Sequence, residues 1–69
     1  MTFEEIIYAV NSGEIVSNDK YFYVKPNPES PTYWKYRGED TWTTGEVNFE
    51  DNVNYFEKEE LWSIVRLVD

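Results

Sequence analysis

The chain has no cysteine and no histidine among its 69 residues, and these two absences exclude much of the common catalytic chemistry. Without cysteine there is no disulfide, no thiolate nucleophile and no thiolate metal site. Without histidine the usual general base near neutral pH is missing. The three glycines form no phosphate-binding loop, and no serine lies in a Gly-x-Ser-x-Gly elbow. We therefore expect a protein that is not an enzyme and that needs no cofactor.

A metal site is not expected either. Glu50, Asn52 and Asn54 follow the spacing of the first ligands of a calcium loop. However, Tyr55 stands where the sharp turn of such a loop needs glycine, and Leu61 stands where the bidentate glutamate belongs.

Long hydrophobic runs are also missing. No apolar stretch approaches the roughly 20 residues of a membrane-spanning helix, and residues 1–5 lack the basic and apolar regions of a signal peptide. The sequence therefore predicts a cytoplasmic protein without a membrane partner.

Basic residues are few and unevenly placed. Six Lys and Arg stand against 14 Asp and Glu, which gives a net charge of −8. Residues 1–19 carry −4, residues 20–37 carry +3, and residues 38–60 carry eight acids and one lysine. The sequence thus has a basic middle and a strongly acidic second half, and a partner with a basic surface is expected.

Aromatic residues are abundant, at 19% of the chain, and they argue against disorder despite a mean hydropathy of −0.69. The length permits a single domain over residues 1–69 with a thin core. A homo-oligomer is a further way for so small a chain to gain stability.

The first element is predicted to be a helix. Thr2 and Glu5 have the spacing of a capping box, and Phe3, Ile6, Ile7 and Val10 follow on one helix face. Gly13 can end this helix in the left-handed conformation. The helix should pack on a sheet.

The sheet is predicted from two hairpins. Residues 15–16 and 20–25 flank Ser17-Asn18-Asp19, whose Asn and Asp tolerate a positive φ. Residues 32–37 and 41–47 flank Gly38-Glu39-Asp40. The prolines of residues 26–31 indicate an exposed connection between the hairpins.

The last third is harder to assign. Residues 49–55 fit a loop or a single helical turn, residues 57–61 favour a short helix, and residues 62–68 favour a closing strand over a helix. The predicted fold class is α+β, with an N-terminal helix packed on a small twisted antiparallel sheet of four or five short strands.

The basic middle suggests one candidate site. We expect an aromatic and basic sheet face able to stack a base and hold its phosphate, or, in the alternative, a solvated face held by cross-strand cation–π contacts. The candidate nucleotide-binding residues are Tyr21, Tyr23, Tyr33, Lys35 and Arg37.

The acidic half suggests a second candidate site. Its acids are either a solubility coat or rows of carboxylates that imitate the phosphates of a nucleic acid and occupy the groove of a basic protein. The candidate partner-binding residues are Glu39, Asp40, Trp42, Glu46, Glu50, Asp51, Tyr55, Glu57, Glu59 and Glu60, with Trp42 and Tyr55 as aromatic anchors.

Two segments add a resemblance. Residues 3–6 with 13–16, and residues 59–65, resemble the start and end of small phage domains of the type that includes the nucleotide-sequestering anti-Thoeris proteins. Such proteins typically carry basic residues and a Trp after the first strand, where this chain has residues 17–19, so no ligand residue is carried over. Residues 53–61 are similar to the last turn of SH3-like barrels. Both resemblances imply a compact, non-enzymatic phage or mobile-element protein. If a phage encodes the chain, its place is the host cytoplasm.

Three functional hypotheses follow. The first is a phage or mobile-element inhibitor that blocks a host nucleic-acid-binding or defence protein by charge mimicry, without binding long nucleic acid itself. The second is a small-nucleotide binder or sponge that uses the aromatic and basic face. The third is a structural subunit of a phage assembly.

Overall fold

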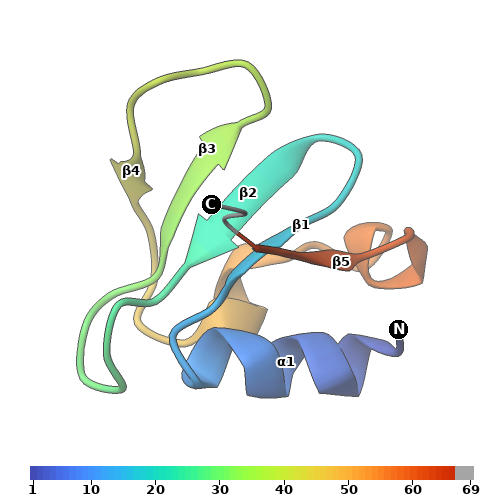
Figure 1. Ribbon diagram of the computed structural model, residues 1–69, viewed down its shortest axis with the longest axis horizontal. Coiled ribbons are helices and arrows are strands. Elements are labelled where there is room, and N and C mark those ends of the chain that lie inside the picture. The colour runs from blue at the N-terminus through green and yellow to red at the C-terminus, as the bar shows by residue number, and fades with distance from the viewer. Residues whose placement is uncertain (67–69) are drawn as a thin grey trace.

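The computed structural model describes residues 1–66. One α-helix, α1 (Phe3–Asn11), packs on an open antiparallel sheet of five short strands (Figure 1). The predicted α+β class and the predicted number of strands are confirmed. Within the described residues, no helix has the length and apolar character needed to cross a membrane.

Helix α1 begins and ends as the sequence predicts. The Glu5 amide donates to Thr2 Oγ1 (3.2 Å), and the Thr2 amide donates to Glu5 Oε1 (2.9 Å), so the capping box is complete. Gly13 follows the helix with φ +89°, a conformation that residues with a Cβ rarely adopt. Ile6 and Val10 on the inner face are fully buried.

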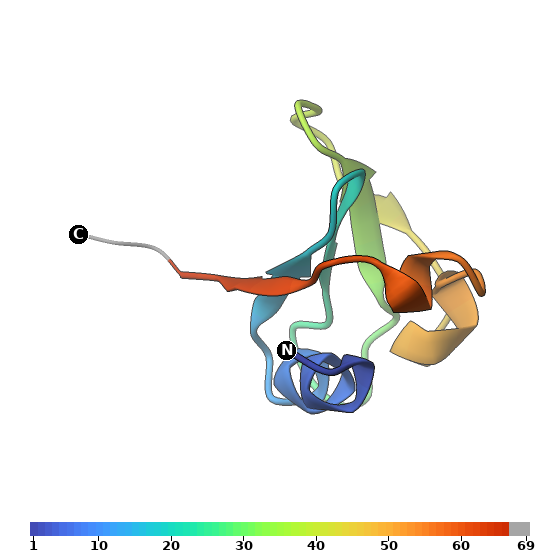
Figure 2. The same cartoon turned by 90° about the vertical axis from the view of Figure 1, so that its right-hand side faces the viewer.

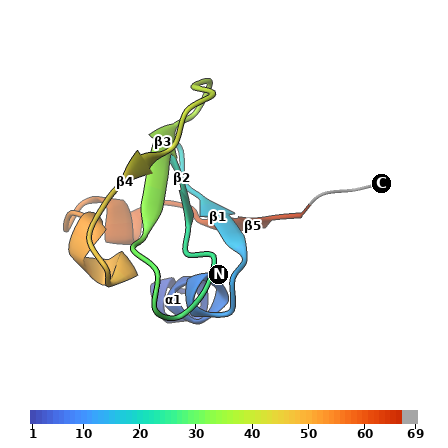
Figure 3. The same cartoon turned by 90° about the vertical axis from the view of Figure 1, so that its left-hand side faces the viewer.

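The strands are β1 (Ile15–Ser17), β2 (Tyr21–Val24), β3 (Tyr33–Tyr36), β4 (Thr43–Thr44) and β5 (Ser63–Val65). Their order across the sheet is β4-β3-β2-β1-β5, and every neighbouring pair is antiparallel (Figures 1 and 3). Both predicted hairpins, β1–β2 and β3–β4, are present, although β4 is shorter than the predicted 41–47. The last strand returns to pair with the first, which makes β1 an interior strand.

The turn between β1 and β2 differs from the prediction in one respect. In the part of the chain that the structure describes, no residue other than glycine has a positive φ, so neither Asn18 nor Asp19 adopts the expected conformation. Instead, Asn18 Oδ1 accepts hydrogen bonds from the amides of Lys20 (2.9 Å) and Tyr21 (2.8 Å). Hydrogen bonds to the Asn18 side chain therefore stabilise this turn, and no residue in it needs a positive φ.

The C-terminal third consists of two 3₁₀ helices and the closing strand. Of the two structures expected for residues 49–55, a loop or a single helical turn, the helical turn is present as η1 (Phe49–Asn52). The helix expected over residues 57–61 is present as the shorter η2 (Glu57–Glu59). The strand expected over 62–68 is present as β5, while its last two positions lie outside the described residues.

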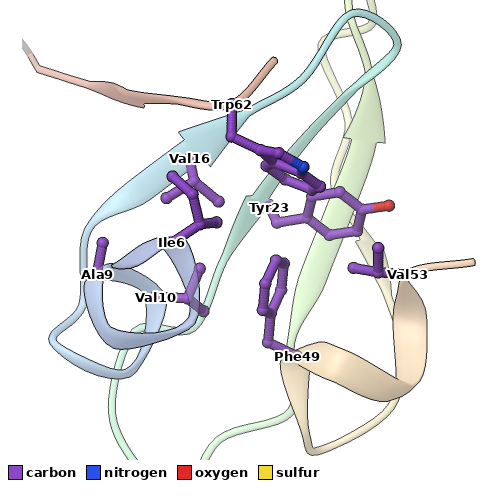
Figure 4. Close-up of a cluster of buried hydrophobic side chains, with 8 residues drawn as sticks. All are labelled: Ile6, Ala9, Val10, Val16, Tyr23, Phe49, Val53 and Trp62. Atoms are coloured by element: carbon purple, nitrogen blue, oxygen red, sulfur yellow. The ribbon is translucent and has the colours of Figure 1, made fainter. Parts of the chain in front are cut away.

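The core lies between the sheet, α1 and η1 (Figures 2 and 4). Aromatic rings fill much of it: Phe49 packs edge-to-face on Tyr23 (5.2 Å between centroids) and on Trp62 (5.8 Å). The buried apolar residues are Ile6, Ala9, Val10, Val16, Tyr23, Phe49, Val53 and Trp62. A thin core is thus filled by few but large side chains.

Candidate functional site

The register of β2 and β3 separates the residues of the expected nucleotide site. Tyr23 pairs with Trp34, and Phe22 pairs with Lys35. Directly paired residues point to the same side of a sheet, so Tyr21 and Tyr23 share the helix-covered side with Trp34. The prediction that the five candidate residues form one face is therefore wrong, and Tyr23, 2% exposed, belongs to the core.

The register could not be predicted from the sequence because each strand has aromatic residues at both odd and even positions, as in Tyr21-Phe22 and Tyr33-Trp34. If the pairing of β2 with β3 were shifted by one residue, the side chains of one strand would change sides of the sheet, and aromatic residues would still lie on both sides.

The helix-free side of the sheet does carry basic and aromatic residues. Lys35 Nζ lies 4.8 Å from the centre of the Trp42 ring and 5.6 Å from that of Phe22, and the Arg37 guanidinium lies 5.2 Å from Phe22. Arg37 also donates to the Asn18 carbonyl (3.1 Å). Both cations are thus held against aromatic rings, as the alternative of a cross-strand cation–π face expected.

The acidic candidates do not form one continuous row. Glu39 and Asp40 lie in the β3–β4 hairpin loop, at the end of the molecule away from η1 and η2 (Figure 2). The Glu39 carboxylate accepts from the Tyr36 amide (3.1 Å) and so helps to form the loop. Trp42 packs on Lys35, on the helix-free side of the sheet. The second expected anchor, Tyr55, lies in the connection between η1 and η2.

Residues 46–61 form the main acidic surface. Four of their acids are exposed, namely Glu46, Glu50, Asp51 and Glu59. The ion pair recorded among residues 1–66 joins Arg66 and Glu14 (3.7 Å), so these four carboxylates have no cationic partner within the described chain.

Exposed aromatic residues lie within the same segment. Tyr55 is 70% exposed and Phe56 79% exposed, with their rings edge-to-face at 6.0 Å. Sequence reasoning selected Tyr55 but missed Phe56, because a Phe within an irregular acidic stretch carries no periodicity to indicate exposure. We call residues 46–61 the acidic–aromatic segment.

This segment is held in shape by asparagine side chains. Asn52 Oδ1 accepts from the Glu46 amide (2.7 Å), and Asn52 Nδ2 donates to the Asn48 carbonyl (2.9 Å). Asn54 and Glu57 form two reciprocal hydrogen bonds. The Asn54 backbone amide donates to Glu57 Oε2 (2.9 Å), and the Glu57 backbone amide donates to Asn54 Oδ1 (3.0 Å). These hydrogen bonds link both 3₁₀ helices to the backbone beside them, and the exposed side chains extend from this hydrogen-bonded base.

Glu57 is the acidic candidate that the structure places inside the molecule. It is 4% exposed, and its Oε1 accepts from the Tyr23 hydroxyl (2.6 Å) and from Asn18 Nδ2 (3.0 Å). Its backbone carbonyl accepts from Trp62 Nε1 (2.8 Å). The expectation that Glu57 contacts a partner at the surface is therefore wrong.

These contacts change the acidity of the core tyrosine. Burial raises the pKa of the Tyr23 hydroxyl well above its ordinary value of 10, and the hydrogen bond to Glu57 raises it further. Tyr23 therefore stays protonated and remains a donor to Glu57 throughout the physiological range.

No known family, curated protein or solved structure matches this chain. Function is therefore inferred from the chain's own residues. Among residues 1–66, no three acidic side chains are grouped so that they could hold a metal ion.

Proposed function

We propose that this chain is a non-catalytic binding protein that occupies the nucleic-acid-binding surface of a basic protein. The observation that carries the proposal is the acidic–aromatic segment, in which four exposed carboxylates that make no recorded ion pair share one stretch of chain with the exposed pair Tyr55 and Phe56. Carboxylates steer a basic partner and fix its orientation. Exposed aromatic rings supply the desolvated anchors that carry most of the binding energy at protein interfaces.

The hydrogen bonds within the segment support the same function. A solubility coat needs charge but no fixed geometry, whereas Asn52 and Asn54 hold this part of the backbone in one arrangement. Preorganised surfaces lose less conformational entropy on binding. A phage or mobile-element inhibitor of host defence is the form of this function that we propose for the intact protein.

Charge reversal tests the proposal. The full chain should capture its partner from a bacterial lysate, and duplex DNA should displace that partner because the two ligands share one basic surface. Replacing Glu50, Asp51 and Glu59 together by Lys should weaken the complex by about tenfold or more and flatten its salt dependence.

The matched control reverses three exposed acids elsewhere, Glu4, Asp19 and Glu29, and so changes the net charge equally. It should leave affinity nearly unchanged. Equal losses in both triple variants would mean that only net charge matters, and a complex that resists both DNA and high salt would refute mimicry.

A second pair of variants measures the contribution of the aromatic anchors separately from that of the charges. Replacing Tyr55 and Phe56 by Ala should increase the dissociation rate at any salt concentration, since apolar contacts are not screened. Tyr8→Ala, at an equally exposed tyrosine on α1, is the control. Unchanged dissociation of the double variant would remove the aromatic pair from the interface.

The helix-free side of the sheet supports a second candidate, binding of a small nucleotide. Tyr33, Lys35 and Arg37 lie on that side with Phe22, so a phosphate and a base could be held there without Tyr21 or Tyr23. A thermal-shift series with nucleotides tests it, because a ligand of the native state raises the melting temperature. No shift with any nucleotide would reject this function.

A further inference from the structure

One edge of the sheet is open. β5 is the outermost strand on that side, and the backbone of residues 63–65 makes no recorded hydrogen bond within residues 1–66 beyond its pairing with β1. An edge strand leaves alternate N–H and C=O groups without a partner. Proteins often protect such an edge with a charge or a proline, but Ser63-Ile64-Val65 contains neither. A further strand can therefore pair with β5.

The opposite edge offers less. β4 consists of Thr43 and Thr44 alone. A strand of two residues gives an added strand few hydrogen bonds, and short edge strands are one of the ways in which proteins prevent unwanted pairing. The β5 edge is thus the better place for a partner strand.

A groove lies beside the β5 edge, between this strand and α1 (Figure 1). Its volume is about 390 Å³, and Met1, Ala9 and Ile64 supply apolar lining. Ile64 pairs with the core residue Val16, so its side chain points to the α1 side of the sheet. Alternate side chains of a strand added to β5 would lie on that same side. We call this feature the α1–β5 groove.

The α1–β5 groove is acidic. Glu4, Glu5 and Glu14 line it. Glu4 makes no recorded hydrogen bond or ion pair within the described chain, and Glu5 uses Oε1 to cap α1. The nearby cations are the amino group of Met1 and Arg66, which lies 3.7 Å from Glu14 in an exposed pair of the kind that contributes little. The carboxylates therefore outnumber the cations and attract a basic ligand.

We propose that β5 and the α1–β5 groove bind an extended segment of a partner protein in which Lys or Arg alternates with apolar residues. The backbone of the segment pairs with β5, as in other complexes formed by strand addition. The stems of its basic side chains lie on Ala9 and Ile64, while the charged ends reach Glu4 and Glu14.

A second copy of the chain fits this surface less well. Each copy carries −8, and pairing β5 with β5 about a two-fold axis would bring two sets of groove carboxylates toward each other. Like charges that meet across an interface oppose association, whereas a basic segment is attracted. Charge therefore favours a segment from another protein.

The proposal is independent of the proposed function. The complex that DNA displaces is proposed at the acidic–aromatic segment, so Glu4 and Tyr8, which line the groove, remain controls for that complex. A failed DNA competition would leave the β5 proposal intact, and failed peptide binding would leave the proposed function intact.

The test is a titration of the full chain with acetyl-Lys-Val-Lys-Val-Lys-Val-Lys-amide. The isomer acetyl-Lys-Lys-Val-Val-Val-Lys-Lys-amide has the same composition and charge without the alternation. We expect saturable binding of the alternating peptide, about tenfold tighter than that of the isomer, and slower solvent exchange of a backbone amide within residues 63–65. Equal affinities, or unchanged exchange in β5, would overturn the proposal.

N-methylated peptides test the backbone pairing. In a paired strand only alternate residues direct their N–H groups to the neighbouring strand. N-methylation of the central Val and N-methylation of the Lys beside it should therefore differ, with one weakening binding by about tenfold and the other leaving it nearly unchanged. Equal affinities of the two methylated peptides would reject strand pairing.

Two double variants test the charges. Glu4→Gln with Glu14→Gln should weaken binding of the alternating peptide by about fivefold. Asp19→Asn with Glu29→Gln makes the same charge change at exposed positions outside the groove and should weaken it less than about twofold. Equal losses would show that net charge alone attracts the peptide and would reject the groove.

Sizing of the full chain tests the second copy as occupant. We expect a monomer at the concentrations of the titration. A dimer that dissociates when the alternating peptide is added would assign the β5 edge to a second copy of the chain and would overturn the proposal.

Discussion

Glu57 shows how much one side chain can organise in a thin core. Its carboxylate accepts hydrogen bonds from the Tyr23 hydroxyl, the Asn18 side-chain amide and the Asn54 backbone amide. Its backbone carbonyl accepts a hydrogen bond from the Trp62 indole N–H. A buried carboxylate is tolerated only when its oxygens are satisfied in this way. Each of these donors therefore contributes to stability.

Removing one donor tests that conclusion. Tyr23→Phe keeps the ring in the core but deletes the 2.6 Å bond to Glu57. The expected loss in the free energy of unfolding is about 2 kcal/mol, typical of a hydrogen bond to a charged group. Urea unfolding measures it, with Tyr33→Phe as the control, since the Tyr33 hydroxyl makes no recorded hydrogen bond. Equal losses in the two variants would contradict this role of Glu57.

The same tyrosine makes stability depend on alkaline pH. Because the pKa of Tyr23 is raised in the folded protein above its ordinary value of 10, the folded state keeps a proton that the unfolded chain releases. The stabilisation is complete below pH 10 and is lost as the pH rises further. Between pH 9 and 11 the free energy of unfolding should fall less steeply in Tyr23→Phe than in the parent chain, and parallel curves would contradict the raised pKa.

At the scale of the element, the joint between β4 and η1 depends on one close approach. A Cβ at Gly45 would overlap Asn52 Oδ1 and lie 3.1 Å from the Thr32 carbonyl. Asn52 cannot turn away freely, because its side chain binds Glu46 and Asn48. Gly45 is therefore needed for its lack of a side chain, and not for an unusual φ.

Gly45→Ala should cost about 1–3 kcal/mol, the usual range for forcing extra atoms into a packed site. Chemical denaturation measures the loss, and Thr41→Ala in the exposed hairpin loop is the control. Asn52→Ala has a cost of its own, because it removes the hydrogen bonds to Glu46 and Asn48. If overlap with Asn52 is the cause, Gly45→Ala should therefore cost less in the Asn52→Ala background than in the parent chain. Equal costs in the two backgrounds would assign the loss to the Thr32 carbonyl.

The elements differ in how far sequence could predict them. Helix α1 was predictable because the capping box, the apolar face and Gly13 all lie within 13 consecutive residues. The register of β2 on β3 was not, since Tyr, Phe and Trp occupy both phases of these strands. Local patterns define an element, whereas its face and register depend on what it meets in space.

The candidate site was predictable only in part for the same reason. Exposure of Glu50 and Asp51 follows from their polarity, but burial of Glu57 depends on Tyr23 and Asn18, which lie 34 and 39 residues away. No local signal distinguishes Glu57 from Glu59. The cavity that Glu57 lines with Tyr21 and Trp34 likewise combines residues from β2, β3 and the last third of the chain.

At the scale of the whole molecule, charge opposes folding. The chain carries −8, and one ion pair, between Arg66 and Glu14, is recorded within residues 1–66. Folding into a body of 27 × 24 × 20 Å brings the unpaired acids together. Self-repulsion therefore lowers the stability of the compact state.

Salt should relieve this repulsion. The Debye length falls from about 30 Å at 0.01 M salt to about 10 Å at 0.1 M, which is below the dimensions of the molecule. The urea midpoint should therefore rise with sodium chloride over this range. The triple Lys variant at Glu50, Asp51 and Glu59, with a smaller net charge, should respond less. A midpoint that falls with salt would mean that attractive pairs outweigh repulsion.

The return of β5 to β1 also decides when this protein can fold during its synthesis. Ile15 pairs with Val65, and Val16 pairs with Ile64, so the interior strand completes its hydrogen bonds with some of the last described residues. A ribosome adds residues from the N-terminus, and α1 with the first hairpin emerges while β5 is still unmade. The nascent chain therefore leaves the exit tunnel with an open edge on β1, and the sheet closes only after translation of residue 65.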